Sequence, residues 1–407
     1  MRSSFFKLTF GILLVLFSMR SFSQNWPQWR GSNRDGKVTG FSAPQTWPQQ
    51  LKQSWKMPVG FGDATPALVN NRLYVFTRQG DKELLLCLDA ATGKQIWASE
   101  GYSTPAPTGP PASHPGPRSS PAVAEGKVVT FGVNGIFSCF DASTGKLIWR
   151  NSEFTDKPTF FTAMSPVISE GVCVAHFGGD KTGQYVAFNL ANGSIKWETD
   201  GDGIAYASPS LMTVDGTKMV VFQGTTKLVG VGFADGKVLW EVPTPLGAGR
   251  AYACSSPIID GQKVYYTGLN NGVNAIEIRK QGSSFVANKL WTNPDFSTTY
   301  NTPVLKDGFL YGLSNQNKLF CINATNGQTA WVDAAAHQNF GSIIDAGSVI
   351  VALSSTSNLV VYRPSGTGYS QLALIKVADT PVYAHPILSG NRIFVKDNES
   401  LILYTTN

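Results

Sequence analysis

The sequence predicts an all-β protein, an eight-bladed β-propeller built from four-stranded antiparallel blades. Three observations predict it: a glycine turn followed by a tryptophan recurs along the chain, a Ser/Thr-Pro pair precedes each copy, and no segment beyond the N-terminus shows a sustained helical period. The repeats are spaced by about 45 residues, which is the length of one four-stranded blade.

The recurring turn supplies the last hairpin of each repeat. Its Thr-Gly, Asn-Gly or Asp-Gly pair provides the positive φ that a tight hairpin needs, and a Trp follows the Gly by four positions. The structural pairs are Gly93 with Trp97, Gly145 with Trp149, Gly193 with Trp197, Gly236 with Trp240, and Gly327 with Trp331. Trp291 ends a further copy, in which we expect a longer loop over residues 280–288 in place of the turn.

The Ser/Thr-Pro pairs mark where the first strand of each repeat begins. They start at Thr65, Ser120, Ser165, Ser208, Ser256 and Thr302, and His385-Pro386 is a degenerate eighth member. The interval between Pro303 and Pro386 leaves room for one further repeat, beginning at Ser342. In the second repeat we expect strands at 122–124, 128–132, 136–141 and 146–149, with polar and apolar residues alternating as stacked sheets require.

The two ends of the repeat region complement each other. The last repeat, from Tyr383 to Tyr404, holds only three strands, whereas an unassigned strand at 51–56 precedes the first repeat and contains Trp55. Pairing this N-terminal strand with the C-terminal blade would close the ring and remove its exposed edges. A seven-bladed ring is the alternative, if residues 338–380 do not form a full blade.

The N-terminus predicts export. Arg2 and Lys7 precede a ten-residue apolar stretch at 8–17, and Ser21 and Ser23 place small residues before a cleavage point at Gln24. We therefore expect a signal peptide at 1–23, an N-terminal extension at 24–50, a propeller at 51–407, and a periplasmic or secreted location. No cysteine lies near the cleavage point and no other apolar run is long enough to span a bilayer, so neither a lipid anchor nor a membrane span is expected.

Charge and cysteine placement exclude other classes. The formal net charge is +6, and removal of the three basic residues of the signal would leave +3, which is too little and too dispersed for nucleic acid binding. Three of the five cysteines, Cys87, Cys139 and Cys321, occupy equivalent repeat positions and are expected to be buried thiols. A pairing between Cys173 and Cys254 stays open.

The repeat resembles that of a known family. The turn and its Trp, following a Ser/Thr-Pro strand start, are similar to the tryptophan-docking repeat of quinoprotein dehydrogenases and to the propeller lipoprotein of outer-membrane β-barrel assembly. The opening segment from Trp26 to Gly36 resembles the start of secreted bacterial proteins called pyrroloquinoline-quinone (PQQ)-binding-like. The resemblance covers nearly the whole chain after residue 23 and implies the fold, but these Trp and Gly residues are architectural.

The sequence departs from both functions that the resemblance implies. Quinoprotein dehydrogenases carry adjacent cysteines and a calcium-binding set of Glu, Asn and Asp, neither of which is identified here, and the lipoprotein needs a lipidated cysteine. None of the four histidines has metal-ligand spacing, and no nucleophile motif is present. We therefore assign no catalytic or metal-binding residue and expect no cofactor, although PQQ with calcium remains open.

A candidate ligand site follows from blade geometry, because the loops that enter the inner strands converge on one mouth of the channel. Two positions before each strand start the chain reads Asp63, Arg118, Ala163, Tyr206, Cys254, Tyr300, Phe340 and Tyr383, with Asn301 and His385 one step deeper. This funnel could stack a planar or sugar ligand, with Arg118 offering its fork to a carboxylate. Alternatively, these residues plug the channel. Two Pro-rich loops, 101–117 and 243–253, should rise over the same mouth.

Two functions from different classes remain. The first is a non-catalytic exported scaffold, expected to be a monomer, that binds an envelope or extracellular protein, peptide or polysaccharide through its mouth or rim. The second is a PQQ- and calcium-dependent oxidoreductase. Carboxylates converging near the axis would favour the second, and an aromatic mouth with few carboxylates would favour the first.

Overall fold

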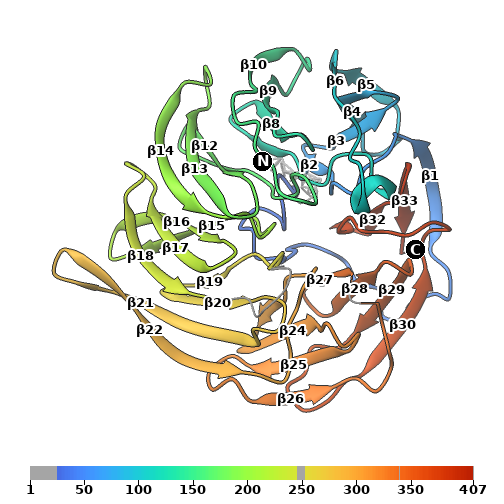
Figure 1. The fold of residues 1–407 in the computed structure, drawn as a ribbon. Helices are drawn as coiled ribbons and strands as arrows, with labels where there is room; N and C mark the ends of the chain where they lie inside the picture. The colour runs from blue at the N-terminus through green and yellow to red at the C-terminus, as the bar shows by residue number, and fades with distance from the viewer. Residues whose placement is uncertain (1–24, 245–252, 339, 407) are drawn as a thin grey trace, which may run out of the picture.

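A computed structural model describes residues 25–244, 253–338 and 340–406 and shows eight antiparallel sheets arranged around a central channel (Figure 1). The predicted eight-bladed propeller is therefore confirmed. The first four blades are β2 (Ala67–Val69), β3 (Arg72–Gln79), β4 (Lys82–Asp89) and β5 (Gln95–Ala98); β7 (Ala122–Ala124), β8 (Lys127–Phe131), β9 (Phe137–Asp141) and β10 (Leu147–Asn151); β11 (Val167–Ser169), β12 (Val172–Gly178), β13 (Thr182–Asn189) and β14 (Ile195–Asp202); and β15 (Ser210–Val214), β16 (Thr217–Gln223), β17 (Lys227–Gly232) and β18 (Val238–Pro243).

The other four blades follow the same order from the channel outward. They are β19 (Ile258–Asp260), β20 (Lys263–Thr267), β21 (Val273–Gln281) and β22 (Ser284–Asn293); β23 (Val304–Lys306), β24 (Phe309–Leu313), β25 (Leu319–Asn323) and β26 (Thr329–Val332); β27 (Gly341–Asp345), β28 (Ile350–Ser354), β29 (Asn358–Tyr362) and β30 (Gln371–Lys376); and β31 (Ile387–Ser389), β32 (Arg392–Lys396), β33 (Ser400–Thr405) and β1 (Lys52–Pro58). A short extra strand, β6 (Tyr102–Ser103), pairs with β4, and the 3-10 helix η1 (Pro110–Ser113) lies in the loop after it.

Ring closure occurs as expected from the two chain ends. β1 pairs antiparallel with β33 and supplies the outer strand of the eighth blade, with Trp55 opposite Leu403 (Figure 1). The seven-blade alternative is wrong, because β27 to β30 form a complete sheet.

The expected loop at 280–288 is not a loop. β21 continues to Gln281 and β22 begins at Ser284, so the segment is a long hairpin that projects beyond the other blades (Figure 1). Alternating residues such as Phe285 and Ala287 pack against the core of the fourth blade, and this contact extends both strands. The hairpin needs its tertiary partner, which the local sequence does not show.

The turn glycines hold neighbouring blades together. A Cβ added at Gly145 would lie 2.4 Å from the ring of Trp97 in the preceding blade, and one at Gly93 would lie 2.8 Å from that of Trp55. Gly193, Gly236 and Gly327 meet Trp149, Trp197 and Trp291 in the same way. Each tryptophan thus packs on the next blade, and Trp55 extends this packing across the closure of the ring.

The Ser/Thr-Pro pairs link the blades near the channel. The main-chain N–H of Ser120 donates to the Ser165 hydroxyl, and that of Ser165 donates to the Ser208 hydroxyl, at 2.9 Å each. At the closure, His385 takes the place of the Ser or Thr and its N–H donates to Thr65 Oγ1 at 2.8 Å. The hydroxyls of Thr65, Ser165 and Ser208 therefore each satisfy a buried donor of the neighbouring blade.

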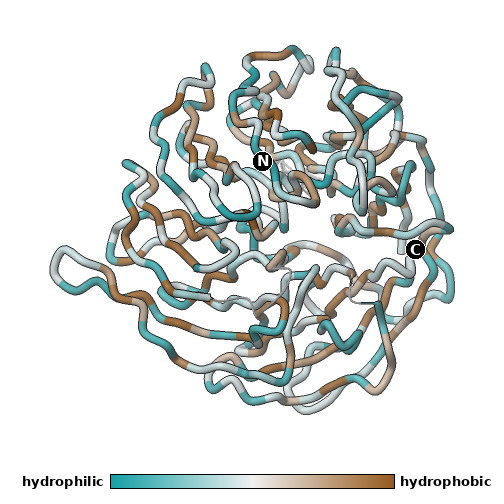
Figure 2. Tube along the Cα trace, in the orientation of Figure 1, coloured by the Kyte–Doolittle hydropathy of each residue, from teal (hydrophilic) through white to brown (hydrophobic). Residues whose placement is uncertain are grey.

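The hydrophobic core lies between blades rather than in one central cluster. The largest cluster joins the first, seventh and eighth blades, and six others lie between further neighbours. Hydrophobic stretches recur along the strands around the whole ring (Figure 2). All five cysteines are unpaired, and Cys173 and Cys254 do not form a disulfide.

The N-terminal extension enters the channel and contacts every blade. Residues 26–42 form hydrogen bonds to each of the eight blades, either to the inner strand or to the residues next to it. In blade order, the bonds join Leu68 to Trp26, Val123 to Pro27, Pro166 and Pro209 to Arg34, Ser256 to Trp29, Thr302 to Arg30, Asp345 to Val38, and Gly390 to Ser42. The extension is thus part of the packed interior of the propeller.

Candidate functional site

The mouth of the channel carries an arc of three aromatic side chains, one from each of the sixth, seventh and eighth blades. Tyr300 and Phe340 stack with their ring centroids 3.8 Å apart and their planes 8° from parallel. Tyr383 meets Phe340 edge-on, at 5.7 Å and 89°. Phe340 is 39% exposed, an uncommon value for a Phe in a folded chain. We call Tyr300, Phe340 and Tyr383 the aromatic arc.

A His-Asp contact continues the arc into the first blade. His114 follows η1 in the Pro-rich loop, and its Nδ1 lies 2.6 Å from Asp63 Oδ2. Its ring also meets Tyr383 edge-on at 4.8 Å. Because the Asp63 N–H donates to Pro117 O at 2.8 Å, this loop lies over the mouth, as predicted. His114 was not among the predicted site residues, since nothing local in the sequence pairs it with Asp63.

Arg118 does not present an open fork to a ligand, contrary to expectation. Its terminal nitrogens donate to the main-chain oxygens of Phe160 and His114, both at 2.8 Å. Burial lowers the pKa of its guanidinium. Asp63 and Arg118 each contact His114 but form no ion pair with each other among the described residues. Arg118 therefore joins two loops at the mouth.

The remaining ring positions pack into the protein. Tyr206 is buried, and its hydroxyl accepts a hydrogen bond from the Phe160 N–H at 3.0 Å. Ala163 and Cys254 lie against the hydrophobic cluster that contains Tyr206. Of the second Pro-rich loop, 243–253, residues 245–252 lie outside the described part of the chain. The structure thus separates the predicted ring into an open aromatic side and a closed side.

The two deeper positions are structural. The Asn301 amide donates to Leu313 O and accepts from the Leu313 N–H, which ties the loop to β24. His385 is buried with its ring centroid 4.3 Å from that of Trp29, and burial lowers the pKa of His385 well below its usual value. The channel below the mouth is filled by the N-terminal extension and not by the predicted ring residues.

The carboxylates at the predicted ring and in the Asp200–Asp202 loop have protein partners in the described structure. Asp63 is the acid among the ring positions, and it is engaged by His114. Within the described residues, no group of three His, Cys, Asp or Glu side chains is placed to hold a metal ion. In the Asp200–Asp202 loop, Asp202 accepts hydrogen bonds from the main-chain N–H groups of Thr226 and Lys227, at 2.6 and 3.0 Å, so it stabilises a turn.

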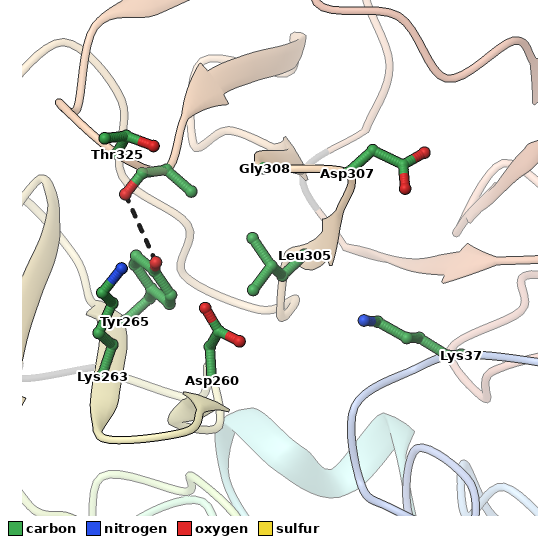
Figure 3. Close-up of a pocket in the computed structure, with 9 residues that line it drawn as sticks. Lys37, Asp260, Lys263, Tyr265, Leu305, Asp307, Gly308 and Thr325 are labelled. Atoms are coloured by element: carbon green, nitrogen blue, oxygen red, sulfur yellow. Dashed lines mark hydrogen bonds between the residues drawn. The ribbon is translucent and has the colours of Figure 1, made fainter.

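A hollow of about 220 Å³ lies between the fifth and sixth blades, where their inner strands end (Figure 3). Lys37 of the extension and Lys263 line it together with Asp260 and Asp307. Tyr265 lies at its wall, with its hydroxyl 3.4 Å from Ala324 O. Two cations and two carboxylates balance in this hollow, which gives it no preference for either sign of charge.

Comparison with known proteins agrees with the architecture. Residues 104–333, more than half of the chain, match the family described as outer membrane protein assembly factor BamB. The BamB of Moranella endobia is 22% identical over 406 residues, covering 90% of this chain and 93% of the relative. The crystal structure of BamB from Moraxella catarrhalis superposes with a TM-score of 0.64 at 12% identity, covering 87% of this chain and 99% of that one.

In sequence, quinoprotein enzymes match over a shorter stretch, whereas the crystal structure of quinohemoprotein alcohol dehydrogenase from Comamonas testosteroni covers 94% of this chain and 80% of that one, with a TM-score of 0.65 at 13% identity. The quinohemoprotein alcohol dehydrogenase ADH IIB of Pseudomonas putida is 39% identical over 90 residues, which cover 21% of this chain and 12% of the enzyme. Among the described residues, no helix is both long enough and apolar enough to cross a membrane.

Proposed function

Because the chain belongs to the family of outer membrane protein assembly factor BamB, we propose that it is a non-catalytic scaffold that binds a protein partner through the mouth of its propeller. The observation that carries this proposal is the aromatic arc, with Phe340 exposed beside Tyr300 and Tyr383. Clustered aromatic side chains bury a large area at little conformational cost, and they dominate the energetics of many protein interfaces.

The shape of the mouth supports a protein segment over a small cofactor. The Pro-rich loop and Arg118 cover the closed side through main-chain contacts, so the partner would approach along the sixth to eighth blades. The tyrosine hydroxyls and His114 at its border provide polar contacts around an apolar centre. This is the composition of an interface with a hydrophobic core and a polar rim.

The location that fits this role is outside the cytoplasm. We propose that residues 1–23 are removed during export and that the protein acts as a monomer in the periplasm or after secretion. We further propose that residues 24–50 accompany the propeller, residues 51–407, as one folded unit. Sequencing the N-terminus of the exported protein tests the cleavage, with Gln24 as the expected first residue.

Site-specific photocrosslinking tests the interaction. A photoreactive phenylalanine analogue is introduced at Phe340 in the full-length chain, and the same analogue is introduced at Leu374 of the same blade as the control, because Leu374 is 56% exposed on the outer strand β30. The proposal expects an adduct from position 340 that contains peptides of a second protein and that position 374 does not form. Equal adducts from both positions, or none from position 340, would contradict it. An adduct that contains sugar and no peptides of a second protein would also contradict it and would indicate a polysaccharide.

The quinoprotein match is the observation that favours a second function, a PQQ-dependent oxidoreductase. Calorimetric titration of PQQ into the mature protein, with and without calcium, decides between the two functions. Tight calcium-dependent binding at one site would contradict the non-catalytic proposal. No binding, combined with the crosslink at Phe340, is the result expected for the scaffold.

A further inference from the structure

A second cavity, of about 410 Å³, lies at the outer rim between the first and second blades, away from the mouth. β5 ends at Ala98 and the chain leaves the outer edge to form β6, which pairs with the start of β4. The space left beside β10 is the cavity. Glu100, Phe140, Lys146, Leu147 and Arg150 line it.

Arg150 is held in one orientation at this cavity. Its guanidinium carbon lies 4.3 Å from the centre of the Tyr102 ring, and its Nε donates to Ser138 Oγ at 2.9 Å. Stacking on an aromatic face together with a hydrogen bond from Nε–H fixes the plane of the guanidinium group. The rotamer entropy that a ligand would otherwise have to remove is thus already reduced.

The support for Arg150 extends into the protein interior. The Tyr102 hydroxyl donates to Glu83 Oε2 at 2.6 Å, and Glu83 is fully buried and also accepts from the Val133 N–H. A Cβ added at Gly132 would lie 2.2 Å from the Tyr102 hydroxyl, so the glycine at this position of the second blade is what allows Tyr102 and Glu83 to fit there. Tyr102 is therefore a rigid base for the guanidinium.

The two terminal nitrogens of Arg150 have no hydrogen-bond or ion-pair partner within the described residues. Lys56 occupies the equivalent position after Trp55, and it lies 3.8 Å from the carboxylate of Asp397. The terminal nitrogens of Arg118 also have protein partners, since they donate to main-chain oxygens. Arg150 thus combines a fixed orientation with available donors.

We propose that this rim cavity binds a small organic monocarboxylate. Its two oxygens would accept from the terminal nitrogens of Arg150, a geometry that a planar guanidinium fork matches in two parallel hydrogen bonds. Lys146 adds a second positive charge, while Phe140 and the 42% exposed Leu147 offer contacts to an apolar body. Glu100 in the same lining opposes a second negative charge, which selects a monoanion over a dianion.

The test uses a matched pair of probes and the mature chain with its blades intact. Calorimetric titration of 4-phenylbutyrate into the protein is compared with the same titration of 4-phenylbutyramide, which keeps the apolar body and removes the charge. We expect the carboxylate to bind at one site and the amide to bind at least about tenfold more weakly, since a charge-assisted bidentate pair is roughly twice as strong as neutral hydrogen bonds.

Three variants test whether the affinity for the carboxylate changes in the expected direction. Arg150→Gln should lower the affinity for the carboxylate by about tenfold. Glu100→Gln should raise this affinity by about threefold, because removal of a nearby negative charge favours binding of an anion. Arg279→Gln is the control with the same change in net charge, at a 62% exposed side chain paired with Glu277. Melting temperatures near that of the parent protein show that each variant is folded.

Several outcomes overturn the proposal: no saturable binding of the carboxylate, equal binding of the amide, or equal affinity in the Arg150→Gln and Arg279→Gln variants. The site is independent of the mouth. The photocrosslink at Phe340 should therefore persist in the Arg150→Gln protein, so the two proposals fail separately.

Discussion

The tryptophans that end the outer strands occupy equivalent positions but do not have equivalent hydrogen bonds. The indole N–H groups of Trp149 and Trp197 each donate to a main-chain oxygen of the next blade, Leu190 O and Phe233 O, at 3.0 Å. The corresponding oxygen for Trp97 is that of Ala142, which accepts from the hydroxyl of Tyr74 at 3.1 Å. Trp97 Nε1 is buried without a partner in the described structure.

This difference predicts unequal effects of the same substitution. Trp149→Phe removes a satisfied hydrogen bond and leaves Leu190 O with only the weak Cys139 thiol donor at 3.8 Å, whereas Trp97→Phe removes a donor that has no partner in the described structure. We expect Trp149→Phe to lower the free energy of unfolding by about 1 kcal/mol more than Trp97→Phe does. Urea unfolding of the two variants measures the difference, and equal losses would contradict the role assigned to the hydrogen bond.

A buried histidine makes stability depend on pH. His176 lies on β12 with its Nε2 2.8 Å from Asp202 O, and burial lowers its pKa to about 4. In the unfolded chain the His176 ring binds a proton near pH 6.5, whereas in the folded chain it stays neutral down to about pH 4. The stability present above pH 6.5 is therefore lost as the pH falls toward 4. The loss attributable to this residue is on the order of 3 kcal/mol.

The variant His176→Gln keeps a donor for Asp202 O and does not titrate. We expect its free energy of unfolding to change less than that of the parent protein between pH 6.5 and pH 4. Denaturant titrations at several pH values in this window give the comparison. Parallel pH profiles for the two proteins would show that His176 does not contribute.

At the scale of the blade, two turn glycines of the second blade allow the cost of backbone strain to be measured apart from the cost of lost packing. Gly126 and Gly145 have φ values of 71° and 73°, so alanine at either position is strained by the left-handed backbone. An added Cβ at Gly126 meets no atom within 4 Å, but at Gly145 it lies 2.4 Å from the Trp97 ring. Only the second position lies between blades.

Gly126→Ala should therefore cost about 1 kcal/mol, the backbone term alone. Gly145→Ala should cost about 1–3 kcal/mol more, because Trp97 must leave its place on the second blade. Denaturant unfolding measures both, and near-ultraviolet circular dichroism should show an altered tryptophan signal only for Gly145→Ala. If the two variants lose equal stability, the turn glycine is a backbone requirement and not a docking surface.

The elements that the sequence predicts are those whose signals are local. Gly145 and Trp149 mark a hairpin and its outer strand within a few residues, and the three-strand last repeat together with Trp55 predicts the closing strand β1. The β21–β22 hairpin escaped prediction because its length depends on packing against the fourth blade. The contact between His114 and Asp63 escaped for the same reason, since it joins a loop to a strand start 51 residues away.

At the scale of the whole molecule, the N-terminal extension connects all the blades through hydrogen bonds in the channel. Arg30 and Arg34 are buried in the channel, and their guanidinium groups donate to main-chain oxygens of Pro303, Pro166 and Pro209 at 2.8 to 2.9 Å. Hydrogen bonds from a charged donor contribute roughly 1.5–3 kcal/mol each. The strand-start hydrogen bonds described above join neighbouring blades, whereas the extension joins all eight blades to one segment.

This topology predicts a collective response when the extension is removed. A chain that begins at Ala43 retains β1 and every blade, but it loses the bonds from residues 26–42 to each of the eight blades. We expect a lower melting temperature and faster amide hydrogen exchange in the inner strands of all the blades, with Arg34→Gln affecting mainly the third and fourth. Hydrogen exchange followed by mass spectrometry resolves the blades separately. If only the first and eighth blades exchange faster, the ring holds itself together through its neighbour contacts, and the extension is an accessory to closure and not the common anchor.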